Sequence, residues 1–142
     1  MSLAGAVAPG STVDAEFGIY ACEPAKRGDI VLYRFAGNPV PVIKIVKGVP
    51  GDHFALSTEL GLSTLLINDG VAKNAQGASY VIAPSERRML ELYVNDNRKG
   101  GYFAVIPADT YLLLGNQAAG SIDSRRFGLV ARGDLLARVT LP

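Results

Sequence analysis

Short apolar runs separated by turn residues are the main pattern of the chain. The runs are rich in β-branched and aromatic residues, and glycine, proline, asparagine and aspartate gather between them. They cover residues 30–35, 40–46, 65–67, 79–82, 90–94, 102–106, 111–114 and 135–141. Many short strands at this spacing are typical of an all-β sandwich or barrel, so we predict an all-β fold with an antiparallel sheet or barrel core. The best helix candidate is 84–91, with Ser85 as its cap.

The middle of the chain is more polar and irregular than the segments on either side. We expect a single domain over residues 1–142, with a core formed by 12–52 and 109–142. A small irregular subdomain, about 53–108, is inserted into that core.

One charged residue stands inside an apolar run. Lys44 is flanked by Val42, Ile43, Ile45 and Val46, and a strand turns it to the same side as Val42 and Val46. An ammonium on an apolar face must snorkel to water, find a partner or lose its proton. Two interpretations follow: a snorkelling lysine on an edge strand, or a lysine whose burial has a chemical purpose.

Composition and charge exclude several classes of protein. With 49% hydrophobic and 19% charged residues, the chain is not intrinsically disordered. Its 14 basic and 13 acidic residues give a net charge of +1, so we expect no nucleic-acid partner. The single cysteine, Cys22, excludes an internal disulfide and a cysteine-based zinc site. No second histidine joins His53, which we predict to be a surface residue, and we expect no metal and no cofactor.

No membrane-spanning segment is predicted. Consecutive apolar residues fall short of the ~18 that a membrane helix needs. The start, MSLAGAVAPGS, has no basic residues ahead of its apolar stretch, so we expect no signal peptide there. This start equally fits the trimmed end of a longer chain.

Three segments resemble, in the same order, the sequence boxes of type I signal peptidases, the membrane-bound Ser–Lys endopeptidases. Segment 26–31, KRGDIV, resembles their RGDIV box, and 43–52, IKIVKGVPGD, is similar to IKRxxGxPGD. Segment 115–128, GNQAAGSIDSRRFG, resembles GDNxxxSxDSRxxG. Upstream, 18–20, GIY, looks like the GLY that follows the nucleophile in the conjugative-transfer (TraF-like) branch. The resemblance implies a signal-peptidase-like β-core and leaves 53–108 mostly unmatched.

By this resemblance Lys44 occupies the general-base position. In the family a serine hydroxyl attacks the scissile carbonyl and a neutral lysine removes its proton. The lysine pKa must then fall from about 10.4 toward about 7–8, and burial beside apolar side chains lowers it. Ser121 matches the serine that orients the lysine amine, and Thr12 matches the oxyanion-hole residue. Asp123 and Arg125 lie two residues apart, and we expect a buried pair that holds the loop.

The chain departs from the family pattern at the nucleophile. The TraF-like branch has Thr-x-Ser-x-Pro-x before GLY, where this chain has TVDAEF. Asp14 therefore stands at the nucleophile position and Glu16 at the proline position, and Asn116 replaces the usual aspartate of the third box. A carboxylate is a poor nucleophile toward an amide. At ~4 Å from Lys44 it would attract the ammonium by about 4 kcal/mol at an effective dielectric of 20, and would raise the lysine pKa. The sequence predicts an Asp14–Lys44 salt bridge rather than a catalytic dyad.

Ser11 is the alternative nucleophile. It lies three residues before Asp14, about 10 Å along an extended chain, and the odd offset points it to the opposite face. Only a bulge or a different alignment would bring it to Lys44. An introduced change at Asp14 is a further alternative, although the departures at Glu16 and Asn116 favour natural drift.

Three functions remain open. The first is a catalytically impaired signal-peptidase-like domain of a protein export or conjugative transfer system, which binds an extended peptide by strand addition. The second is an active Ser/Lys endopeptidase that removes signal peptides from exported preproteins. The third is a structural β-domain of an envelope assembly. The expected partner is an extended segment of a pilin-like or secreted protein. The resemblance also implies a place on the outer face of the cytoplasmic membrane, on the periplasmic side, behind an N-terminal membrane anchor that this sequence does not contain.

Overall fold

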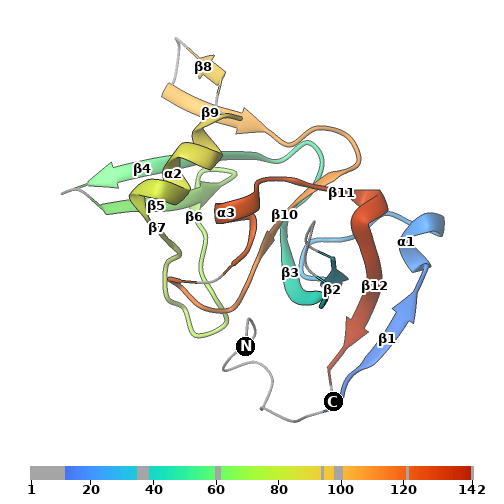
Figure 1. The fold of residues 1–142 in the computed structure, drawn as a ribbon. Helices are drawn as coiled ribbons and strands as arrows, with labels where there is room; N and C mark the ends of the chain where they lie inside the picture. The colour runs from blue at the N-terminus through green and yellow to red at the C-terminus, as the bar shows by residue number, and fades with distance from the viewer. Residues whose placement is uncertain are drawn as a thin grey trace.

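The structure, a computed structural model, consists of two β-sheets and a few short helices (Figure 1). It describes residues 12–34, 39–59, 62–93, 95–97, 101–120 and 122–141. All pairings between the described strands are antiparallel, so the predicted all-β class is confirmed. Each sheet ends in edge strands, and the described strands do not close into a barrel.

The first sheet has six strands in the order β1-β12-β2-β3-β10-β11. Their bounds are Asp14–Phe17 for β1, Leu135–Thr140 for β12, Ile30–Tyr33 for β2, Val42–Gly48 for β3, Thr110–Leu114 for β10 and Val130–Ala131 for β11. Four of the predicted apolar runs supply β2, β3, β10 and β12. Strand β3 lies in the interior of this sheet, between β2 and β10, whereas β1 lies at one end.

The second sheet is formed by the middle of the chain. Its order is β6-β5-β4-β9-β8, and β7 pairs with β5. The bounds are Gly70–Val71 for β6, Leu62–Ile67 for β5, His53–Glu59 for β4, Gly101–Val105 for β9, Asn95–Asn97 for β8 and Val81–Ile82 for β7. The apolar runs missed β4, because its apolar stretch is only three residues long, 54–56, and polar residues follow it. The segment thus carries longer strands than its polar composition indicated, and the domain limits at about 53 and 108 stay a prediction.

Four short helical elements complete the described part of the fold. They are α1 (Ile19–Cys22), α2 (Pro84–Glu91), α3 (Ser124–Phe127) and the 3₁₀ turn η1 (Arg132–Asp134). Helix α2 has the predicted bounds, but its N-cap is Ala83 rather than Ser85, and Glu86 Oε1 accepts a hydrogen bond from the Ala83 amide at 2.8 Å. The expected strand at 90–94 is wrong over its described part. Leu90 is a buried residue in the last turn of α2, and residues 92–93 form a turn.

Strand β10 packs against both hydrophobic cores. Leu112 and Leu114 belong to the core shared with the second sheet and α2, while Tyr111 and Leu113 belong to the core of the first sheet. A strand alternates its faces, so one apolar strand serves both cores. Gly48 of β3 pairs with Leu112 of β10 at close range, since a Cβ at position 48 would be 2.9 Å from Leu112 Cβ. The lysine-bearing strand and the strand before the third box therefore lie side by side.

Candidate functional site

Lys44 lies in the interior of the first sheet, opposite Val31 of β2. Only 1% of Lys44 is exposed, and Val46 is fully buried, whereas Ile43 and Ile45 are partly exposed. The strand thus turns Lys44 to the buried side with Val46, as the alternation predicts. Because β3 has a neighbour on each side, the interpretation as a snorkelling edge-strand lysine is excluded.

Burial lowers the pKa of Lys44 from 10.5 to about 8, because the ammonium loses its hydration. Two charges act on the same amine: the Asp123 carboxylate raises its pKa, and the Arg125 guanidinium lowers it. Near pH 8 a large share of this amine is neutral. A neutral amine at this pH has the chemistry of a general base.

Asp14 lies at one edge of the same sheet. It begins β1, whose residues are all exposed, and β12 and β2 lie between β1 and β3. Three inter-strand spacings of ~4.8 Å place the two strands about 14 Å apart. No ion pair joins Asp14 and Lys44 within the described parts of the chain. The predicted salt bridge is therefore not formed, because the sequence does not reveal the two strands that intervene.

The surroundings of Asp14 are polar and open to water. Thr12 is exposed and precedes β1. Glu16 Oε2 lies 3.3 Å from Arg138 Nη2, and Arg138 Nη1 donates to Glu23 Oε1 at 2.8 Å. Exposed pairs of this kind contribute little to stability. The residue at the nucleophile position thus belongs to a charged surface.

The loop that leads to α3 holds a fully buried ion pair. Asp123 and Arg125 are both 0% exposed. The guanidinium donates five hydrogen bonds: to Asp123 Oδ1 at 2.9 Å and Oδ2 at 2.8 Å, and to the carbonyl oxygens of Val81, Ala118 and Gln117 at 3.1, 2.7 and 3.0 Å. Every N–H of the arginine is therefore satisfied, which a buried charge requires.

Polar groups of the same loop complete its attachment to β10. Asp123 Oδ2 accepts from the Gly115 amide at 2.9 Å, and Ser124 Oγ accepts from the Leu113 amide at 2.8 Å. The latter amide lies at an irregularity of the β10–β3 pairing, where a sheet partner is lost. Sequence reasoning missed Ser124, although its place as the central residue of the Asp-Ser-Arg motif was a usable signal. Ser121 and Ser11 lie outside the described residues, so their predicted roles stay predictions.

A second ionic contact joins the first two sequence boxes. Arg27 donates to Asp52 at 2.6 and 2.9 Å, and Asp52 also accepts from the Val49 amide at 3.0 Å and from Asn68 Nδ2 at 2.9 Å. Burial alone would raise the pKa of Asp52, but these hydrogen bonds outweigh it and lower the pKa to about 2. The sequence reasoning gave neither residue a role; their opposite charges at the ends of neighbouring strands were the available signal.

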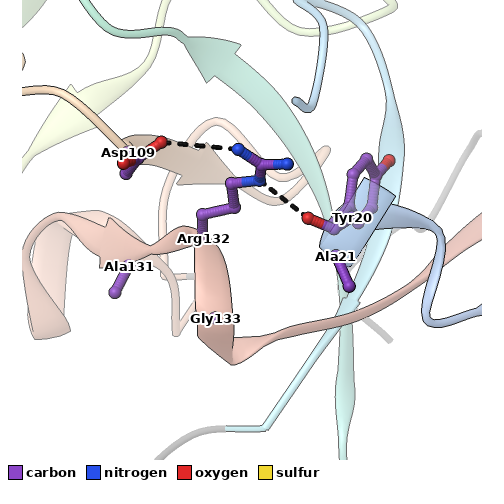
Figure 2. A pocket seen from close by; sticks show the side chains of 6 residues that line it. All are labelled: Tyr20, Ala21, Asp109, Ala131, Arg132 and Gly133. Carbon is purple, nitrogen blue, oxygen red and sulfur yellow. Dashed lines mark hydrogen bonds and ion pairs between the residues drawn. The ribbon is translucent and has the colours of Figure 1, made fainter. Parts of the chain in front are cut away.

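His53 and the described cavity lie apart from this network. The His53 ring is partly exposed and its Nε2 lies 3.2 Å from Asp69, at the turn between β5 and β6. An open cavity of about 370 Å³ is lined by Tyr20, Ala21, Asp109, Ala131, Arg132 and Gly133 (Figure 2). It includes none of the predicted site residues.

The described residues contain neither a membrane-spanning helix nor a metal site. No helix there is both long and apolar enough to cross a membrane. No group of histidine, cysteine and carboxylate side chains there has the arrangement of a metal site.

The family of the chain follows from comparison with known proteins. Residues 3–142 match the sequence model of the family described as signal peptidase, peptidase S26. Among solved structures, the chain is similar to a signal peptidase I from Enterococcus faecalis V583, with 22% sequence identity, a TM-score of 0.49, and coverage of 83% of this chain and 98% of that one. No curated protein matches the chain. Because the family match extends over nearly the whole sequence, the chain belongs to the signal peptidase family, peptidase S26.

Proposed function

We propose that this chain is a catalytically impaired, TraF-like signal peptidase domain that binds an extended segment of an exported protein. The observation that carries the proposal is the difference between Lys44 and Asp14. The lysine is buried with a pKa of about 8, while a carboxylate occupies the nucleophile position on an exposed strand. The base is thus poised, while position 14 carries no hydroxyl and is separated from the base by two strands.

Strand β1 supports the binding part of the proposal. Within the described sheet β1 has one neighbour, β12, and it ends the strand order. An edge strand offers backbone N–H and C=O groups to an added strand, and this mode of binding needs no nucleophile. The partner would be a pilin-like or secreted protein of an export or conjugation system. The place of action would be the outer face of the cytoplasmic membrane.

The test restores the hydroxyl. Asp14→Ser and the unaltered chain are incubated with a peptide that carries an Ala-x-Ala site, and cleavage is followed by mass. We expect cleavage by neither chain, because two strands separate position 14 from Lys44 and a general base must lie within hydrogen-bond reach of its nucleophile. Both chains should bind the peptide, since strand addition at β1 needs no nucleophile. Cleavage by Asp14→Ser that is lost again on adding Lys44→Met would instead place position 14 beside the base in solution, contrary to the strand order.

Two outcomes would overturn the proposal. If Asp14→Ser stays inert and no extended peptide binds to either chain, the structural role in an envelope assembly replaces it. If the unaltered chain cleaves the peptide and Ser11→Ala abolishes cleavage, the chain is an active endopeptidase. The low pKa of Lys44 favours that second candidate, because the base would be ready for a nucleophile from another position.

A further inference from the structure

Residues 73–81, which follow β6, connect the lysine strand to the loop of the buried ion pair. On one side Lys47 of β3 donates from Nζ to the Lys73 carbonyl at 3.0 Å. On the other side Asn74 Nδ2 donates to the Asn116 carbonyl, and Asn116 Oδ1 accepts from the Ala75 amide, both at 2.9 Å. Figure 1 shows the turn after β6 beside the turn after β10. The segment therefore bridges two parts of the first sheet from outside it.

Asn74 shapes the turn that makes this bridge. Its Oδ1 accepts from the amides of Gln76 at 3.0 Å and Ala78 at 2.9 Å, so the side chain replaces backbone partners within the turn. Asn116 closes the contact by donating from Nδ2 to Gln76 Oε1 at 2.9 Å. Only 2% of Asn116 is exposed. Each of the two asparagines therefore uses its amide both as a donor and as an acceptor, which a carboxylate cannot do.

The far end of the segment is held to the same loop. Tyr80 is fully buried, and its hydroxyl donates to the Gly115 carbonyl at 2.7 Å. The Val81 amide donates to the Ala118 carbonyl at 2.8 Å. The Arg125 guanidinium stacks over the Tyr80 ring, 5.2 Å from its centroid. Contacts at both ends thus fix the course of residues 115–118.

Those residues lie directly beside the lysine strand. Leu114, the last residue of β10, pairs with Ile45, the neighbour of Lys44. The loop then continues to Asp123 and Arg125, the two charges that act on the Lys44 amine. A shift of this loop would change both the distance of these charges and the access of water to Lys44.

We infer that residues 73–81 act as a positioning strap for the candidate site, with Asn74, Gln76 and Asn116 as the positioning residues. The strap holds residues 115–118 against β3 and keeps water away from Lys44. This inference deepens the proposed function, since it concerns the base of the same site.

The test titrates Lys44 in the full chain by NMR of its side-chain amine. Asn74→Ala removes three hydrogen bonds of the strap. Desolvation is the largest cause of the low Lys44 pKa, so water admitted by a loosened loop should raise the titration midpoint by about one unit from its value near 8. Gln76→Ala removes the contact to Asn116 Nδ2 and should raise the midpoint by less. This second variant also tests the inference if Asn74→Ala does not fold.

A matched control separates positioning from plain stability. Asn68→Gly removes two side-chain hydrogen bonds at the turn after β5, and glycine keeps the positive φ of 51° there. This variant should lower the melting temperature without moving the Lys44 midpoint. An unchanged midpoint in Asn74→Ala and Gln76→Ala, together with a lowered melting temperature, would overturn the inference. The titration needs neither peptide nor cleavage, so its failure is distinct from failure of the proposed function.

Discussion

Lys44 and Asp14 belong to the same sheet, yet one is 1% exposed in the interior and the other lies on an exposed edge strand. Around Lys44, burial has the largest effect on the lysine pKa, and the buried charges of Asp123 and Arg125 need hydrogen-bond partners. Around the aspartate, water hydrates the charges, and the ion pairs of Arg138 lie at the surface. The position of Lys44 is therefore fixed by folding itself, whereas Asp14 is under no such constraint.

The difference explains how one half can change without the other. Replacing a buried charge partner leaves an uncompensated charge in the interior, which is strongly destabilising. Replacing an exposed residue on an edge strand alters the free energy of unfolding little. A carboxylate at the exposed position 14 is thus tolerated by the fold.

The largest predicted effect is at the buried pair. Arg125→Met leaves Asp123 buried without its partner and should lower the free energy of unfolding by about 3–5 kcal/mol, measured by urea denaturation at pH 7. Arg87→Met is the control: its side chain lies 3.0 Å from Glu91 in a pair that is exposed on both sides, and its loss should cost about 1 kcal/mol or less. Equal losses in both variants would show that the loop does not depend on burial of the pair.

Lys44→Met should stabilise the chain. The folded-state pKa of about 8 lies below the unfolded value of 10.5, so between these pH values the unfolded chain binds more protons. The free energy of unfolding therefore rises with pH through this window, and below it Lys44 costs about 3 kcal/mol. The variant should gain stability of that order at pH 7 and lose the rise between pH 8 and 10.5. Lys26→Met, at an exposed position, should keep the rise; its disappearance there would contradict the assignment to Lys44.

The exposure of the Arg27–Asp52 contact is intermediate between that of the two regions: the Arg27 side chain is 50% exposed and the Asp52 side chain 10%. The pKa of Asp52 is lowered from 3.8 to about 2, so its contribution is present above pH 3.8 and is lost as the pH falls toward 2. Asp52→Asn should therefore lower the free energy of unfolding by about 2 kcal/mol at pH 6 and by almost nothing at pH 2. Asp69→Asn at the neighbouring exposed turn should change it by less than about 0.5 kcal/mol at either pH. A loss that is the same at both pH values would exclude a charge effect.

Local patterns in the sequence predicted the lysine half well. The alternation around Lys44 sets its face because a strand has a period of two residues, and this holds in any sheet. The bounds of α2 followed from proline at its start and from the spacing of its polar residues. The cap did not, because Glu86 reaches back to the Ala83 amide and makes a Ser85 cap unnecessary.

Non-local facts could not be predicted in the same way. The order of the sequence boxes does not reveal that β12, from the C-terminal part of the chain, lies between β1 and β2. The prediction of an Asp14–Lys44 salt bridge was wrong for that reason. The partners of Arg125 from residues 81, 117 and 118 are likewise backbone carbonyls, which no side-chain pattern marks. Strand β4 was missed because its apolar stretch covers only residues 54–56 and is followed by polar residues.

The smallest predicted effect is the sharpest test of the comparison. Asp14→Asn removes the charge at the nucleophile position while nearly keeping its shape. At about 14 Å in a water-like dielectric, two unit charges interact by only about 0.3 kcal/mol, and salt screens this further. We expect a change in the free energy of unfolding within about 0.5 kcal/mol and a Lys44 titration midpoint that stays near 8. A midpoint that falls by one unit or more would mean that the Asp14 carboxylate faces the lysine in solution. The two regions would then form one site, contrary to the strand order of the sheet.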